Sequence, residues 1–153
     1  MRRLLIVAYG NPLRSDDGVA WRAAEALQEV FSPNEVEILT MHQLGPEVAE
    51  SISRSQCVIF VDAAAGPGRP GEIEIKELSS TNSEGADSSA FCHAVSPGNV
   101  LALAAQLYQA RPKAFSVTIV GGNFQHGESL SPAVEAALPS LLARIGELSK
   151  EFV

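Results

Sequence analysis

Three polar clusters in this sequence combine carboxylate and imidazole side chains that could carry chemistry. The first is the segment 10–18 (GNPLRSDDG), which contains Asp16 and Asp17. The second is Asp62, which directly follows an apolar run, and the third is His93, which lies shortly before a Ser-Pro pair. Two carboxylates and one imidazole are a suitable ligand set for a borderline divalent transition metal. Three protein ligands would also leave coordination positions open for a substrate.

Each of these residues also has a simpler structural explanation. Asp16 and Asp17 open a helical pattern, where a carboxylate can cap free N–H groups and interact favourably with the helix dipole. Asp62 could satisfy the amides of a turn at the end of its strand. A single histidine in a polar loop, such as His93, is most often only solvated. Spacing alone therefore leaves two interpretations open, a metal-binding crevice or separate structural roles.

Other classes of site fit the sequence less well. Gly10 follows a predicted strand, but neither G-x-G-x-x-G nor G-x-x-x-x-G-K-[ST] is present, and the nearby aspartates would repel a pyrophosphate. A Ser–His–Asp hydrolase is disfavoured because there is no G-x-S-x-G elbow. Cys92 precedes His93, but adjacent residues on an extended chain point to opposite sides, so we interpret Cys92 as structural. Of the other two histidines, both in predicted loops, His42 follows a strand and is the one placed to line a cleft, whereas His126 has no assigned role.

The elements that must position these residues alternate between strand and helix. Apolar or alternating runs predict strands at residues 4–8, 36–41, 57–61, 72–78 and 115–120. Helical spacing and start signals predict helices at about 17–31, 46–54, 97–109 and 132–148. Ser15 or Asp16 is the expected N-cap of the first helix, and Pro139 should kink or interrupt the last one. The strand at 72–78 has one charged face and should lie near an edge of the sheet.

This alternation predicts one three-layer α/β/α domain over residues 1–153, with a mostly parallel sheet of about five strands. In such folds the functional crevice lies outside the carboxyl ends of the strands. The three polar clusters follow strands or lie in loops that can reach this edge. The predicted architecture therefore allows a metal-binding crevice at this edge, and the separate structural roles stay open beside it.

Composition and charge exclude several classes of partner. The chain carries 18 acidic and 11 basic residues, so its net charge is −7 and a nucleic-acid partner is not expected. No apolar run approaches the roughly 20 residues of a membrane span, and the N-terminal apolar stretch is too short for a signal peptide. Two cysteines, Cys57 and Cys92, do not make a disulfide framework. We expect a monomeric, soluble protein of the cytoplasm.

Four segments resemble, in order and over nearly the whole chain, the motifs of hydrogenase maturation endopeptidases. The family signature G-N-x-L-x-x-D-[DE]-G-x-G is similar to LIVAYGNPLRSDDGVA in this chain. The second motif, an apolar strand ending in Asp, resembles VIFVDAAAGPGRPGEI, and the third resembles HAVSPGNVLALA. The closing strand, loop and helix of the family resemble VTIVGGNFQHGESLSPAVEAAL. Two departures are that Ala20 replaces a common glycine and that Asp17 is shorter than the glutamate of some relatives.

This resemblance implies an endopeptidase that removes the C-terminal extension from the large-subunit precursor of a nickel–iron hydrogenase. It implies that Asp17, Asp62 and His93 contact nickel that arrives with the substrate, so no permanent cofactor is expected. Metal polarisation of the scissile carbonyl and attack by water would follow, with Asp16 as a candidate general base. Two alternatives remain: a non-catalytic nickel-sensing chaperone or docking factor, and a divergent family member that acts on another protein.

Overall fold

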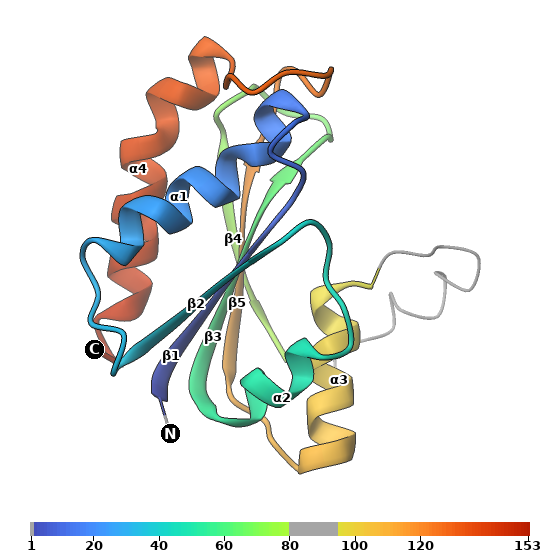
Figure 1. Ribbon diagram of the computed structural model, residues 1–153, viewed down its shortest axis with the longest axis vertical. Coiled ribbons are helices and arrows are strands. Elements are labelled where there is room, and N and C mark those ends of the chain that lie inside the picture. Colours follow the sequence, from blue (N-terminus) through green and yellow to red (C-terminus); the bar gives the residue numbers. More distant parts are fainter. Residues whose placement is uncertain (1, 80–94) are drawn as a thin grey trace.

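The computed structural model describes residues 2–79 and 95–153 and shows one mixed sheet flanked by helices (Figure 1). Its strands are β1 (Arg2–Tyr9), β2 (Val36–Met41), β3 (Ser55–Ala64), β4 (Ile73–Leu78) and β5 (Lys113–Val120). Their order is β2-β1-β3-β5-β4, and every neighbouring pair is parallel except β4 with β5. This arrangement confirms the predicted α/β class, the mostly parallel sheet and the edge position of the charged strand.

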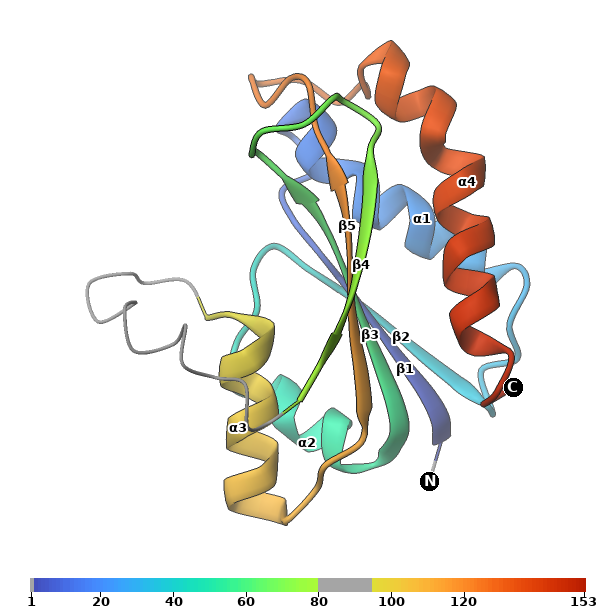
Figure 2. The ribbon, with the colours of Figure 1, turned by 180° about the vertical axis from the view of Figure 1, so that it is seen from behind.

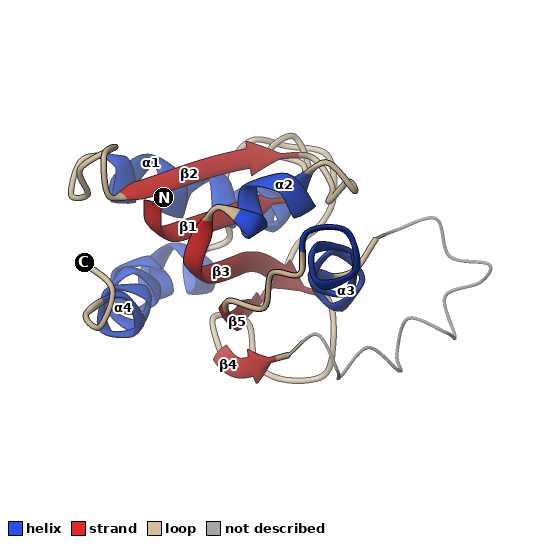
Figure 3. Cartoon of the chain, turned by 90° about the horizontal axis from the view of Figure 1, so that it is seen from below, coloured by secondary structure: helices blue, strands red, loops and turns tan. Residues whose placement is uncertain are grey.

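Helices cover both faces of the sheet. The α-helices are α1 (Val19–Gln28), α2 (Val48–Ser53), α3 (Pro97–Tyr108) and α4 (Pro132–Ser149). Figures 2 and 3 show α1 and α4 on one face and α2 and α3 on the other. Because successive strand residues point to opposite faces, Ile6 and Ile59 pack into the α1/α4 core while Val7 and Phe60 pack into the α2/α3 core. No helix in residues 2–79 or 95–153 is long and apolar enough to cross a membrane.

Burial of both sheet faces explains the apolar runs that predicted the central strands. The buried stretch of β1 includes Leu4, Leu5, Ile6 and Val7, and the buried stretch of β3 covers residues 57–61. A strand covered on both sides has no polar face, so it appears in the sequence as a continuous apolar run rather than as an alternating one. These two strands lie side by side at the centre of the sheet and carry the candidate site at their carboxyl ends.

Two local predictions are wrong, and a third is wrong in part: of the kink or interruption expected at Pro139, the interruption does not occur. β3 continues to Ala64, so Asp62 lies inside the strand rather than after it. Residues 15–18 form a short 3-10 helix, η1 (Ser15–Gly18), and α1 begins after Gly18 with no side-chain cap, because Asp16 bonds elsewhere. Helix α4 continues through Pro139 without interruption. Because Pro139 has no N–H, one carbonyl in the preceding turn lacks its usual helical hydrogen bond. Pro139 is exposed, so water can bond to that carbonyl instead.

The start of α3 follows the predicted signal closely. Ser96 is the N-cap, its hydroxyl accepts the Asn99 N–H at 3.2 Å, and the Asn99 side chain accepts the Ser96 N–H at 2.9 Å. Pro97 occupies the first helical position, where the missing N–H costs nothing. This capping box fixes where the chain enters the α2/α3 face, and Val95 just before it packs against the core of that face.

Candidate functional site

The carboxyl ends of β1 and β3 form the topological switch point of the sheet. After β1 the chain passes through α1 to β2, which lies on one side of β1. The strands that follow β3 in the chain, β4 and β5, lie on the opposite side of the sheet. Crevices of open α/β sheets form where the strand order reverses in this way. Tyr9 lies at the end of β1, Asp62 lies near the end of β3, and Asp17 lies in η1 directly after the β1 loop. The fold therefore brings two of the three predicted ligands to the expected edge.

Tyr9 is a site residue that sequence reasoning missed. Ala8 pairs with Val61 in the sheet, so the next residues along, Tyr9 and Asp62, are neighbours on the α2/α3 face. The Tyr9 hydroxyl hydrogen-bonds to the Asp62 carboxylate. Burial and the Asp62 charge raise the pKa of the Tyr9 hydroxyl above its usual value, so it remains a donor. One signal in the sequence could have identified Tyr9. It ends the apolar run before Gly10, and its side chain carries a polar hydroxyl.

Asp62 is a carboxyl group held in an unfavourable environment for its charge. Burial, followed by the nearby charge of Asp17, raises the pKa of Asp62 to about 7, although the Ala63 N–H and the Tyr9 hydroxyl partly offset this. A carboxylate that is desolvated and next to a like charge prefers either a proton or a cation. Asp17 and Asp62 are therefore a pair at which either a proton or a cation would relieve the unfavourable charge.

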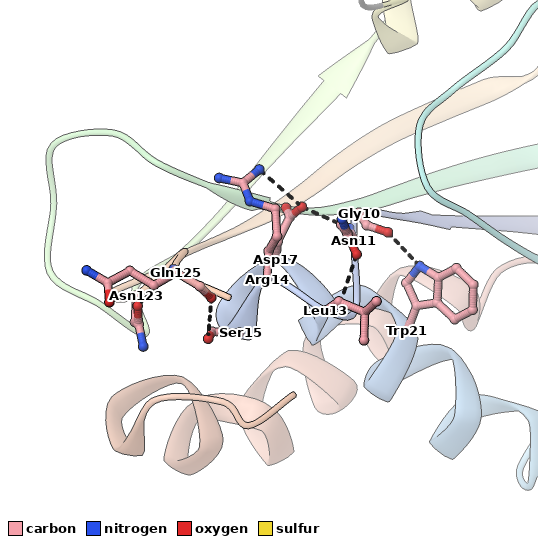
Figure 4. Close-up of polar contacts among 9 residues, drawn as sticks. All are labelled: Gly10, Asn11, Leu13, Arg14, Ser15, Asp17, Trp21, Asn123 and Gln125. Atoms are coloured by element: carbon pink, nitrogen blue, oxygen red, sulfur yellow. Dashed lines mark hydrogen bonds and ion pairs between the residues drawn. The ribbon is translucent and has the colours of Figure 1, made fainter. Parts of the chain in front are cut away.

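The loop after β1 fixes Asp17 beside this strand end (Figure 4). Its Oδ2 accepts the Asn11 N–H at 2.8 Å and lies 3.9 Å from Nη1 of the exposed Arg14. Gly10 has φ +145°, and a Cβ at this position would collide with the carbonyl oxygen of Asp17. Trp21 donates its Nε1–H to the Gly10 carbonyl at 2.9 Å and holds this turn from the helix side. Glycine at position 10 is thus required by the close approach of Asp17.

Asp16 has a structural role that argues against its prediction as a general base. Its side chain is fully buried and accepts four hydrogen bonds of 2.7–3.0 Å from Gly122 N–H, Asn123 N–H, Ser131 N–H and the Ser131 hydroxyl. Burial alone would raise the pKa of Asp16, but these hydrogen bonds outweigh it and the pKa is lowered. A buried, fully bonded carboxylate of low pKa is a poor proton acceptor. Asp16 instead ties the loop at residues 121–131 to η1 and so positions Asp17.

The remaining predicted site residues have mixed outcomes. His93 and Cys92 lie outside the described residues, and within the part that is described no three His, Cys, Asp or Glu side chains form a metal-binding group. His42 is exposed, with its ring in edge contact with Trp21 at 5.7 Å between centroids. His126 is also exposed. Cys57 is fully buried, and burial raises the pKa of its thiol to about 12, which agrees with a structural role.

No family model and no curated protein sequence matches this chain. Several solved structures nevertheless share its fold over nearly the whole length. The hydrogenase maturating endopeptidase HybD from E. coli is 24% identical with a TM-score of 0.76, covering 97% of this chain and 93% of that one. The [NiFe] hydrogenase maturation protease HycI from Thermococcus kodakarensis KOD1 is 23% identical with a TM-score of 0.77, covering 97% and 92%. A hydrogenase 2 maturation peptidase from a Thaumarchaeota archaeon is 21% identical with a TM-score of 0.72, covering 96% and 97%.

Proposed function

We propose that this chain is an endopeptidase of the hydrogenase-maturation type, in which Asp17, Asp62 and His93 contact nickel carried by the substrate. Its substrate would be the large-subunit precursor of a nickel–iron hydrogenase, from which it removes a C-terminal extension after nickel insertion. The observation that carries this proposal is the proximity of Asp17 to the partly buried Asp62 at the β1–β3 switch point, where burial and the Asp17 charge together raise the pKa of Asp62. It is supported by the fold that the chain shares with proteins named as hydrogenase maturation proteases.

The electrostatics of the pair suit the detection of a cation that belongs to another protein. With no cation, Asp62 is partly protonated near neutral pH, because desolvation and the Asp17 charge raise its pKa to about 7. A divalent cation removes the repulsion and displaces that proton. A nickel-loaded precursor therefore gains binding free energy that a nickel-free precursor lacks. An imidazole from His93 would complete a ligand set suited to nickel.

The proposed chemistry is attack of water on a carbonyl polarised by the substrate nickel. Asp16 is not retained as the base, for the reasons given above. Asp62 is the better candidate, because it lies at the switch point and its carboxylate, once the cation has displaced its proton, is free to accept a proton from water. Its two oxygens allow one to contact nickel while the other accepts the proton. Tyr9 would hold the carboxylate in position through its hydroxyl.

Processing of purified precursor tests this proposal. We expect wild type to shorten nickel-loaded precursor, measured by mass spectrometry, and to leave nickel-free precursor intact. The variants Asp17→Asn and His93→Ala should fold normally and lose processing by about a hundredfold or more. His126→Ala is the matched control, because His126 is exposed and has no part in the proposed site.

Two results would contradict the proposal at different levels. Full processing of the nickel-loaded precursor by His93→Ala would show that His93 does not contact nickel. Stable binding of the loaded precursor by wild type without any shortening would favour the non-catalytic chaperone.

A further inference from the structure

Arg14 is the one basic residue of the segment 10–18, the same segment that carries Asp17. Its Nη1 lies 3.9 Å from Oδ2 of Asp17, and Figure 4 shows the side chain reaching over that carboxylate. The Arg14 side chain is 54% exposed, whereas that of Asp17 is 19% exposed. The candidate site therefore has a positive charge on its outer side, next to a carboxylate that we propose contacts nickel.

The backbone around Arg14 is fixed by the fold. Arg14 donates its N–H to the Asn11 carbonyl at 3.0 Å and accepts the Asp17 N–H at 3.1 Å. The next residue, Ser15, has φ +52°, a left-handed conformation that is unfavourable for a residue with a Cβ. The Ser15 N–H donates to the Gly127 carbonyl at 2.8 Å and so holds this conformation. The proximity of Arg14 to Asp17 is thus built into the loop, although the arginine side chain itself is exposed.

The two oxygens of the Asp17 carboxylate have different surroundings. Oδ2 accepts the Asn11 N–H at 2.8 Å and is the oxygen that faces Arg14. Oδ1 lies on the side of Gly10, 3.3 Å from the position that a Cβ would take there. Because neither of the first two contacts uses Oδ1, this oxygen can contact a cation while Oδ2 keeps its partners. A metal ion and Arg14 would then share one carboxylate.

Two cations that share a carboxylate repel each other. An exposed ion pair of this length contributes little to folding stability, so stability does not account for the position of Arg14. Its charge does act on a divalent ion at Asp17, because the repulsion scales with the product of the two charges. At a separation of about 6 Å and an ionic strength of about 0.15 M, this repulsion should weaken the binding of a divalent ion about threefold.

We propose that Arg14 is a counter-cation that keeps free divalent ions off the Asp17–Asp62 pair, so that the pair responds to nickel held by the precursor. A docked polypeptide offers carbonyl groups to which the exposed guanidinium can turn and donate its N–H groups, whereas a free ion offers none. Binding of the precursor therefore relieves the repulsion that a free ion must overcome. The proposal rests on the proposed function and adds to it a selectivity against free metal ions.

Calorimetric titration with Ni²⁺ alone provides the first test and needs no precursor. We expect Arg14→Gln to bind Ni²⁺ about threefold more tightly than wild type at about 0.15 M salt, with a larger ratio at lower salt. Arg14→Lys keeps the charge and should bind as wild type does. Arg22→Gln is the matched control, because Arg22 is also exposed and lies at the same 3.9 Å from its partner Glu135. This control should leave the affinity unchanged.

The double variant Arg14→Gln/Asp17→Asn locates the bound ion. We expect it to lose the gain in affinity, because Oδ1 of residue 17 then carries no negative charge. Free Ni²⁺ should also inhibit processing of nickel-loaded precursor, at a concentration about threefold lower for Arg14→Gln than for wild type. Each inhibited rate is compared with the uninhibited rate of the same variant, so a change in the basal rate does not affect the result.

Several outcomes would overturn the role of Arg14. These are equal Ni²⁺ affinities of wild type and Arg14→Gln, a gain that does not depend on salt, a gain that persists in the double variant, and no Ni²⁺ binding by either protein. All of them leave the proposed function to the processing assay described above. If wild type instead processes no precursor, the proposed function fails, and the titration still decides whether Arg14 excludes free ions.

Discussion

Replacing Asp62 by asparagine should make the protein more stable at pH 8, even though it removes a proposed functional group. Asparagine has nearly the same shape, and its carbonyl oxygen can still accept the Tyr9 hydroxyl. It has no charge to desolvate and none for Asp17 to repel. These are the two effects that raise the pKa of Asp62 to about 7 from an ordinary value of 3.8.

The magnitude follows from the proton linkage of this one group. Between pH 4 and pH 7 the unfolded chain has released the Asp62 proton and the folded chain keeps it, so wild-type stability falls as pH rises. A shift of about three units at 1.36 kcal/mol each gives an upper limit of about 4 kcal/mol. Asp62 is only partly buried, so solvent screening reduces this to about 2 kcal/mol. The stability gain of Asp62→Asn should therefore be near zero at pH 4 and about 2 kcal/mol at pH 8.

Urea unfolding in the presence of a chelator measures this difference. Trp21 is the single tryptophan and hydrogen-bonds to Gly10, so its fluorescence reports directly on the region of the site. Glu25→Gln is the control, because Glu25 is an exposed carboxylate on α1 and its loss should change stability little at either pH. The reasoning fails if Asp62→Asn is less stable than wild type at pH 8, or if its gain is the same at both pH values.

Two further substitutions test how the loops hold the site. Asp16→Asn should destabilise the protein by about 3 kcal/mol at pH 7 in thermal or urea unfolding, because an amide group would face N–H donors at Gly122 and Ser131. Since the pKa of Asp16 is lowered from its usual 3.8, this difference should begin to shrink below pH 3.8 and be lost as pH falls through the lowered pKa, and a difference independent of pH would contradict the assigned role. Gly10→Ala should cost about 2 kcal/mol or more, since φ +145° and the Asp17 carbonyl leave no room for a methyl group. Unchanged stability and processing in Gly10→Ala would refute the close approach.

Periodicity predicted the elements of this fold well because burial acts on each strand and helix separately. Full burial of β1 and β3 produced the apolar runs, and one wet face produced the alternation in β4. Strand order and register were less accessible, because they depend on contacts between segments far apart in the chain. The pairing of Asp62 with Thr118 is one such contact, and no local pattern encodes it.

The roles of the adjacent residues Asp16 and Asp17 show the same limit at the site. Sequence patterns treated both as helix-start carboxylates with possible chemistry. In the fold, Asp16 turns inward to donors more than 100 residues away, whereas Asp17 stays at the strand end with a local partner six residues back. The partners of Asp16 come from the loop before α4, so only the tertiary structure distinguishes a positioning carboxylate from a candidate ligand. Tyr9 was missed for the same reason, because its role depends on β3.

The cost of holding Asp62 next to Asp17 is only one part of what a cation can gain at this site. A bound cation relieves the desolvation and repulsion that raise the Asp62 pKa, and this relief adds to the direct attraction between the cation and the two carboxylates. Relief of about 2 kcal/mol alone corresponds to roughly a thirtyfold preference for a nickel-loaded precursor over an empty one. Asp62→Asn should therefore lose at least this much discrimination, measured as binding of loaded against empty precursor. A loss well below thirtyfold would place the sensor elsewhere than in the carboxylate pair.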